Sequence, residues 1–278
     1  MLNSLSVILS RKRWTKRLTK PWMPKMAHKK IFNRMNFHYD PRDMKGPSFH
    51  FGHDLEKGFL NYEETSKKEL LELIPKEGHF LDVGANIGMY SVYMALNRDD
   101  ITLNCFEPDN TVYSCLAKNM AQFNDNKVQI FKMGLGEEKE EKTLYKHPLN
   151  DGGHSFIEDS NSSESESVQV AVFDELVQQK LVKLPDAIKI DVEGFELHVL
   201  RGMRKSIALK RPVLFIESDN VDLSQKGALW QELASYKDEG IYARRPGRDI
   251  KMSMDELAEE AASEVQKGIT VTNYFFQF

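Results

Sequence analysis

The sequence predicts an α/β fold in which a mostly parallel sheet carries helices on both faces. Short apolar segments typical of buried strands alternate with amphipathic helical segments from about residue 66 onward. Parallel strands need crossover connections, and helices of this length supply them. We therefore expect the 278 residues to form one domain at residues 46–278, preceded by an arm at residues 1–45.

The first half of the domain repeats a strand–helix unit. Ser66 and Glu69 have the spacing of a capping box, which predicts a helix that begins there and ends near Pro75 and Gly78. After it come strands expected at residues 80–83, 101–106 and 128–131, and helices expected at residues 87–96 and 109–120. This pace of alternation favours a parallel sheet with helices on both faces.

The second half is less regular. A short strand is expected at residues 142–145. The acidic, serine-rich stretch at 158–167 lacks apolar groups to bury, so we expect a mobile loop there. Later apolar segments predict strands at 168–173, 187–192 and 212–216, with a helix through Leu197, Leu200 and Met203. Residues 268–278 alternate like a strand and are expected to close the sheet.

Composition limits the class of protein. Cys105 and Cys115 are the only cysteines, which excludes a disulfide scaffold and a four-cysteine zinc site. So few cysteines favour a reducing compartment, and we expect a cytoplasmic location. No apolar run approaches the ~18 residues that a membrane-spanning helix needs.

Charge divides the chain into a basic arm and an acidic body. Residues 1–39 hold ten Lys/Arg and no Asp or Glu, whereas the rest holds 28 Lys/Arg against 42 Asp/Glu. The apolar residues of the arm precede its charges, the reverse of a secretory signal. Three interpretations stay open: packing on an acidic body, contact with an anionic membrane through Trp14 and Trp22, or contact with nucleic acid. Because the acidic body opposes a polyanion, nucleic acid is not an expected partner.

A glycine-rich turn, FLDVGANIGMY, follows the first strand of the domain. Glycines let the backbone approach a ligand closely, and the helix N-terminus offers free N–H groups. Glu107, followed by Pro108, ends the next strand 23 residues after Gly84. A carboxylate there can accept hydrogen bonds from both ribose hydroxyls of a nucleoside cofactor. The residues expected at this cofactor site are Asp82, Gly84, Ala85, Asn86, Gly88, Glu107 and Pro108.

The spacing of the turn also bears on the kind of cofactor. A dinucleotide fingerprint reads G-x-G-x-x-G, and Asn86 stands where its second glycine would be. No P-loop sequence is present. S-adenosylmethionine carries no phosphate and has a sulfonium cation, and an acidic Asp82 beside the turn suits its cationic amino acid group better than a pyrophosphate.

Four segments of the sequence resemble the FkbM family of methyltransferases. LDVGANIG, CFEP, KIDVEGFELHVLRGM and PVLFIES occur in that family's order and spacing, over roughly residues 60–278. The resemblance implies a Rossmann-like class I methyltransferase fold with seven strands, the last antiparallel, and S-adenosylmethionine as methyl donor. It implies that Asp82, Gly84, Asn86 and Gly88 line the methionine end, that Glu107 holds the ribose, and that Met133 and Gly134 border the adenine. Family members methylate hydroxyls of sugars or polyketide-type products, so a sugar or glycan acceptor is expected.

Charged side chains gather at the carboxyl end of the strand expected at 187–192. Lys189 and Asp191 are two residues apart and share a face, and Glu193 can turn into the same site. A neighbouring cation keeps a carboxylate ionised. Methyl transfer requires the acceptor hydroxyl to lose a proton, and the candidates to take it are Asp191, then Glu193, then His154 in DGGHSF. Lys189 completes the expected catalytic set.

Several alternatives stay open. Asp191 with Asp219 and Asn220 would imitate the Mg²⁺ ligands of some small-molecule O-methyltransferases, although the resemblance requires no metal and none is expected. The acceptor can instead be a small natural product or an amine. A nucleic-acid base methyltransferase is disfavoured because the chain has no Asn/Asp-Pro-Pro-aromatic motif. A non-catalytic module that binds a partner through its arm is disfavoured by the intact set of Asp82, Gly84, Glu107 and Asp191. Oligomeric state is left open.

Overall fold

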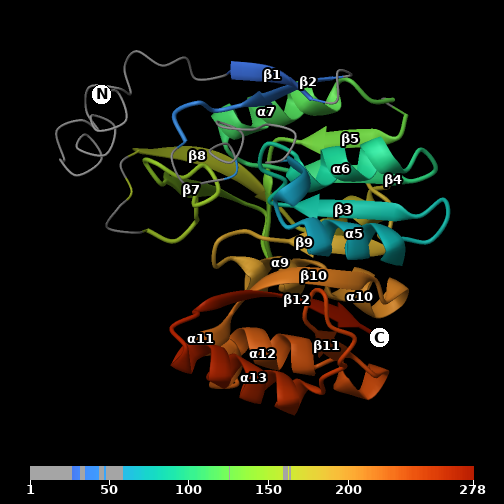
Figure 1. The fold of residues 1–278 in the computed structure, drawn as a ribbon, viewed down its shortest axis with the longest axis vertical. Coiled ribbons are helices and arrows are strands. Elements are labelled where there is room, and N and C mark those ends of the chain that lie inside the picture. The colour runs from blue at the N-terminus through green and yellow to red at the C-terminus, as the bar shows by residue number, and fades with distance from the viewer. Residues whose placement is uncertain are drawn as a thin grey trace, which may run out of the picture.

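The computed structural model describes residues 27–31, 35–43, 47, 59–124, 126–158, 162 and 164–278, and a seven-stranded sheet runs through its centre (Figure 1). The strand order is β11-β12-β10-β9-β3-β4-β5. All neighbouring pairs from β10 to β5 are parallel, whereas β12 runs antiparallel to β10 and β11. The expected mostly parallel sheet with an antiparallel last strand is confirmed. The strands are β3 (His79–Val83), β4 (Thr102–Phe106), β5 (Val128–Phe131), β9 (Ala187–Ile190), β10 (Val213–Asp219), β11 (Tyr242–Arg244) and β12 (Val271–Gln277).

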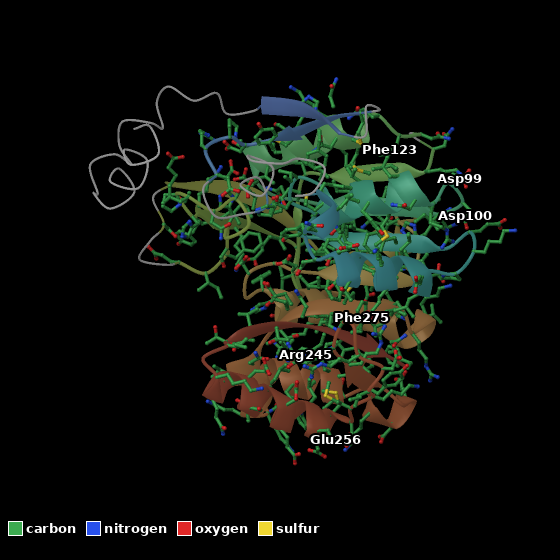
Figure 2. The ribbon with its side chains drawn as sticks, viewed as in Figure 1. Asp99, Asp100, Phe123, Arg245, Glu256 and Phe275 are labelled. Carbon is green, nitrogen blue, oxygen red and sulfur yellow. The ribbon has the colours of Figure 1, made fainter. Side chains whose placement is uncertain are left out.

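Alternating side chains of these strands build two cores, one on each face of the sheet. Phe80, Phe215 and Phe275 pack into the core beneath α5 (Glu64–Leu73), α6 (Met89–Asn97) and α7 (Asn110–Met120). Leu81 and Ile216 point the other way, into the second core. Of the helices that the structure describes, those covering that face are α8 (Phe173–Gln178), α9 (Glu196–Gly202), α10 (Arg204–Lys210), α11 (Asn220–Ser224), α12 (Ala228–Ala234) and α13 (Met254–Gln266). Figure 2 places Phe275 inside the molecule and Asp99 and Asp100 at its rim.

A smaller sheet crosses the carboxyl side of the large one and corrects the prediction of a mobile loop at 158–167. It contains β6 (Gly134–Leu135), β7 (Glu140–Lys146) and β8 (Glu164–Ala171) in the order β6-β8-β7. Residues 164–167 therefore belong to a strand. Lys146 Nζ on β7 lies 3.0 Å from Glu166 Oε1 on β8. Polar pairs between the strands therefore stabilise a segment that has few apolar side chains to bury.

Two element boundaries also differ from the expectation. Helix α5 begins at Glu64 after Glu63, and Ser66 lies buried within it, so the capping box expected at Ser66 is wrong. A capping box does form at Ser253 and Glu256, at the start of α13. The last strand does not close the sheet either: β12 lies between β10 and β11, and the short β11 forms the edge.

A hairpin of β1 (Ala27–Ile31) and β2 (Met35–Tyr39) lies within the range expected for the arm, yet β2 packs on the domain. Phe37 is fully buried, and the backbone N–H of His38 donates to Asn119 Oδ1 of α7 at 2.6 Å. The domain boundary at residue 45, the cytoplasmic location and membrane contact by residues 1–39 stay predictions. Trp14 and Trp22 lie outside the described residues. Within the described ranges, no helix combines the length and apolar character needed to cross a membrane.

Candidate active site

The carboxyl ends of β3, β4, β9 and β10 surround a cavity, as expected for ligand sites in open parallel sheets. The turn after β3, Glu107 after β4, Asp191 and Glu193 after β9, and Glu217 on β10 all line it. Asn150, Asp151, Gly152 and His154 of the loop before β8 also line the cavity. Segments that are far apart in the sequence therefore meet at one edge of the sheet.

The turn after β3 depends on Gly84, which has a φ of +72°. A Cβ atom at this position would lie 1.9 Å from the carbonyl oxygen of Asp191, so no other residue allows the end of β9 to come this close. Ala85 and Asn86 follow on the cavity wall. The absence of a side chain at Gly84 therefore lets the expected cofactor turn lie against the end of the strand that leads into the acidic residues.

Glu107 is held by backbone donors at the end of β4. The N–H of Asn86 donates to Oε2 at 2.9 Å and that of Asp109 to Oε1 at 2.8 Å. Each oxygen keeps a further lone pair, and the residue lines the cavity although it is only 7% exposed. Burial raises the pKa of this carboxyl to about 7. A fixed carboxyl with spare acceptor capacity fits the two ribose hydroxyls of S-adenosylmethionine.

His154 belongs to the same end of the cavity. Its Nδ1 lies 3.3 Å from Asp109 Oδ2, and Lys146 Nζ lies 2.7 Å from that oxygen. Burial alone would raise the pKa of Asp109, but His154 and Lys146 hold it well below its usual range. Asp109 also caps α7 and donates its N–H to Glu107. These contacts connect His154 to the Glu107 side and give no support to its expected role as the proton acceptor.

Asp82 does not line the methionine end as expected, because it lies beneath the turn. Its side chain is fully buried, and Ser91 Oγ of α6 donates to Oδ2 at 2.5 Å. Lys189 Nζ lies 3.7 Å from Asp82 Oδ1 and 3.1 Å from Asp191 Oδ2, and it donates to the carbonyl oxygen of Gly84 at 2.7 Å. Asp82 therefore supports the site through Lys189 instead of contacting the cavity.

Of four further residues expected at the cofactor site, two line the cavity and two do not. Pro108 and Gly134 line the cavity. Gly88 and Met133 are not part of its lining: Gly88 precedes α6, where a Cβ would lie 2.9 Å from Leu116, and Met133 packs on the core. Direct cofactor contact by Gly88 and Met133 stays a prediction.

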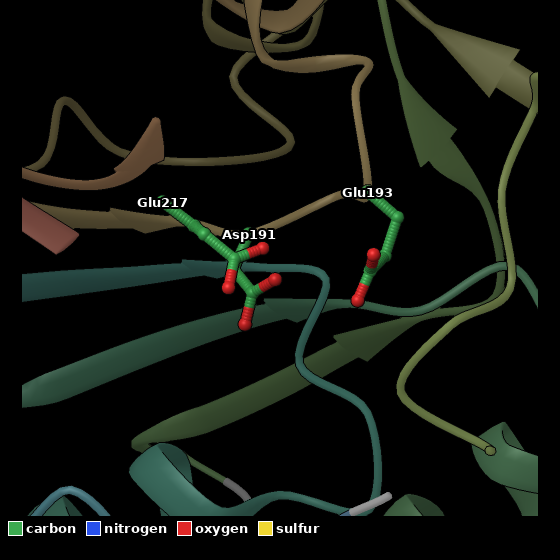
Figure 3. A group of neighbouring side chains, drawn as sticks. All are labelled: Asp191, Glu193 and Glu217. Carbon is green, nitrogen blue, oxygen red and sulfur yellow. The ribbon is translucent and has the colours of Figure 1, made fainter. Parts of the chain in front are cut away.

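Three carboxylates also converge on the cavity wall. One carboxylate oxygen from each of Asp191, Glu193 and Glu217 lies within 4.8 Å of the others (Figure 3). Glu193 has a left-handed backbone with φ of 52°, and Ser155 Oγ donates to its carbonyl oxygen at 2.7 Å. Burial and the charge of Asp191 raise the pKa of Glu193 to about 8 and that of Glu217 to about 10.

Sequence reasoning missed Glu217 as a site residue. Its position follows from strand pairing, because Phe215 on β10 is the register partner of Lys189 on β9, and Glu217 lies two residues further on the same face. The alternation of PVLFIES marks the faces of the strand, but the alignment with β9 is a long-range property. Knowledge of that register would have placed Glu217 beside Asp191.

The Mg²⁺ ligand set suggested for Asp191, Asp219 and Asn220 is not assembled. Asp219 Oδ1 accepts the N–H of Val221 at 2.7 Å and caps α11. The Asn220 side chain is buried and donates to Thr272 Oγ1 at 2.7 Å. Both side chains therefore serve the β10–α11 junction, and this set is wrong.

Comparison with known proteins identifies the family. Residues 82–240, more than half of the chain, match the family model described as the methyltransferase FkbM domain. The chain belongs to the FkbM methyltransferase family. This match confirms the family expected from the sequence and its methyl donor, S-adenosylmethionine.

Curated relatives are similar over part of their length. Methyltransferase 1 of Beauveria bassiana is 31% identical over 46% of this chain, and the hexuronic acid methyltransferase AglP of Haloferax volcanii is 26% identical over 53%. The chain spans 59% of the length of each. Among solved structures, the methyltransferase FkbM of Methylobacillus flagellatus KT has a TM-score of 0.45 and 17% identity over 80% of this chain and 54% of that one.

Proposed function

We propose that this protein transfers a methyl group from S-adenosylmethionine to a hydroxyl group of a sugar or glycan. The observation that carries the proposal is the division of one cavity between Glu107, which fits a ribose, and Asp191, which faces the same space with Lys189 beside it. The similarity to a relative named hexuronic acid methyltransferase supports a sugar as the acceptor.

The cofactor end would hold and orient the donor. Glu107 would accept hydrogen bonds from the ribose hydroxyls, while the N–H groups of Asn86 and Asp109 fix its carboxyl group. When bound, S-adenosylmethionine supplies an electrophilic methyl group on a sulfonium. A hydroxyl oxygen in line with that methyl carbon, about 3 Å away, is in position to attack.

The opposite end would remove the proton of the acceptor. Asp191 is the base, because its side chain lines the cavity, is 28% exposed and has Lys189 Nζ at 3.1 Å beside it. Glu193, with its pKa raised to about 8, is mostly protonated at neutral pH and donates a hydrogen bond to the acceptor. A positioned base contributes about 10²–10⁴-fold to such a step.

A methyl-transfer assay tests this assignment. The full chain is incubated with S-adenosylmethionine labelled in its methyl group and with a panel of hexuronic acids, neutral sugars, phenols, amines and oligonucleotides. We expect label in a sugar hydroxyl, located by mass spectrometry. Label only in phenols or amines would establish the small-molecule alternative instead. Donor binding without transfer to any member would favour the non-catalytic module.

A further inference from the structure

Glu217 lies between the cavity and a second hollow. Besides the cavity, it lines a hollow formed with Ser66, Arg245, Thr272 and Asn273. Arg245, labelled in Figure 2, belongs to the segment after β11. Of the three clustered carboxylates, Glu217 is the one that borders this hollow. It is therefore the carboxyl group of the cluster that borders both spaces.

The groups around Glu217 leave its charge uncompensated. Asp191, Glu193 and Glu196 face it from the segment after β9 and from α9. Burial and these charges raise the pKa of Glu217 to about 10, with a hydrogen bond between it and Asp191 adding to the effect. Glu63, at the start of α5, adds a further carboxyl group nearby, hydrogen-bonded to Tyr90 and Asn273.

The neighbouring cations are engaged elsewhere. Lys189 contacts Asp191 and Asp82, and Nη1 of Arg245 pairs with Glu260 and Glu264 on α13 at 3.2 and 3.1 Å. Among the described residues, no Lys or Arg forms an ion pair with Glu217 within 4.0 Å. Three ionised carboxylates at this separation repel one another strongly, so the cluster retains a proton.

We propose that Glu217 shares a proton with Asp191 and carries the proton lost by the acceptor to water in the second hollow. This step rests on the proposed methyl transfer. As the new O–C bond forms, the O–H bond of the acceptor breaks and its proton binds Asp191. Glu217 releases its own proton to water in the hollow and takes the one held by Asp191. One proton leaves per methyl group transferred, both carboxyl groups return to their starting states, and no further reactant is needed.

Thermal unfolding tests the shared proton without any acceptor. The unfolded chain releases the Glu217 proton near pH 4.5, whereas the folded chain keeps it to about pH 10, so wild-type stability falls as pH rises between these values. We expect the unfolding midpoint of Glu217→Gln to fall less than that of wild type between pH 6 and pH 9. Asp219→Asn, which removes a charge from the same strand end and keeps the cap, should follow wild type. Identical pH dependence in wild type and Glu217→Gln would overturn the proposal.

Turnover tests the transfer itself, with the acceptor found in the panel. We expect Glu217→Gln to lower kcat about 10²-fold, with KM unchanged and a shifted pH profile, and Glu217→Asp to restore part of the rate. A raised KM with unchanged kcat would make Glu217 an acceptor-binding residue and overturn the relay. If no panel member is methylated, the proposed function fails while the unfolding experiment still decides whether the proton is shared.

Discussion

The two ends of the cavity use carboxyl groups in opposite ways. At the cofactor end, Glu107 receives a backbone N–H at each oxygen and keeps only the acceptor capacity that a ribose would use. At the other end, Asp191, Glu193 and Glu217 lie close together, and Lys189 forms an ion pair with Asp191. The first arrangement gives a fixed binding group. The second arrangement gives carboxyl groups that can exchange protons.

The acidic end lowers the stability of the fold, and it is the end where the proposed reaction occurs. Like charges close together and a left-handed backbone at Glu193 both oppose folding, and such features gather at functional sites. Among the residues that the structure describes, the cofactor end has no comparable cluster of three carboxylates, and the donors to Glu107 come from the backbone of the turn and of the helix start. Mutations at the acidic end should therefore change kcat, whereas mutations at the cofactor end should change the affinity for S-adenosylmethionine.

The largest expected effect follows from Asp191→Asn. An amide cannot take the acceptor's proton, so kcat should fall about 10²–10⁴-fold. Affinity for S-adenosylmethionine should change little, because the ribose contact remains. Steady-state methyl transfer and calorimetric titration measure the two quantities, with Asp219→Asn as the matched control. Full turnover in Asp191→Asn would show that another group removes the proton.

Glu107→Ala should weaken the binding of S-adenosylmethionine and leave kcat at saturating donor nearly unchanged. Losing hydrogen bonds to a charged group costs about 1.5–3 kcal/mol, which corresponds to about 10–100-fold weaker binding of S-adenosylmethionine. Calorimetry of the variant measures this loss, and at saturating donor kcat should recover. Unchanged affinity would mean that the ribose lies elsewhere.

Gly84→Ala tests the contact that joins the two ends. The added Cβ would meet the Asp191 carbonyl oxygen, and the residue would keep a positive φ, so we expect a loss of about 2–5 kcal/mol in the free energy of unfolding. Gly240→Ala is the control, since φ is +86° there and nothing lies within 4 Å of the new Cβ. Strain alone should cost about 1 kcal/mol at that position. If urea unfolding gave equal losses of unfolding free energy for the two variants, the close contact between Gly84 and Asp191 would not explain the effect.

Chelation should have the smallest effect. Lys189 already compensates Asp191, and Asp219 and Asn220 are engaged at the start of α11, so turnover should persist in EDTA. Loss of activity on EDTA treatment, with recovery on added Mg²⁺, would show that the acidic end uses a divalent ion.

Local patterns predicted the cofactor end better than the acidic end. The spacing of the glycine turn and Glu107 lies within two adjacent strands, so order along the chain indicated their proximity. Glu217 depends on the register of β10 against β9, and no local pattern sets that alignment. Asp82 was placed in the cavity because it precedes the turn, but strand alternation directs it toward Ser91 instead. Residues 164–167 form a strand because β7 supplies their backbone hydrogen-bonding partner, and a polar sequence alone does not predict that pairing.

A crystal structure of the chain with S-adenosylhomocysteine would test the division of the cavity most directly. The account predicts both ribose hydroxyls within about 2.6–3.2 Å of the Glu107 carboxylate, and the sulfur facing the space between Asp191, Glu193 and Glu217. A ribose bound away from Glu107, or a sulfur directed away from the three carboxylates, would contradict it.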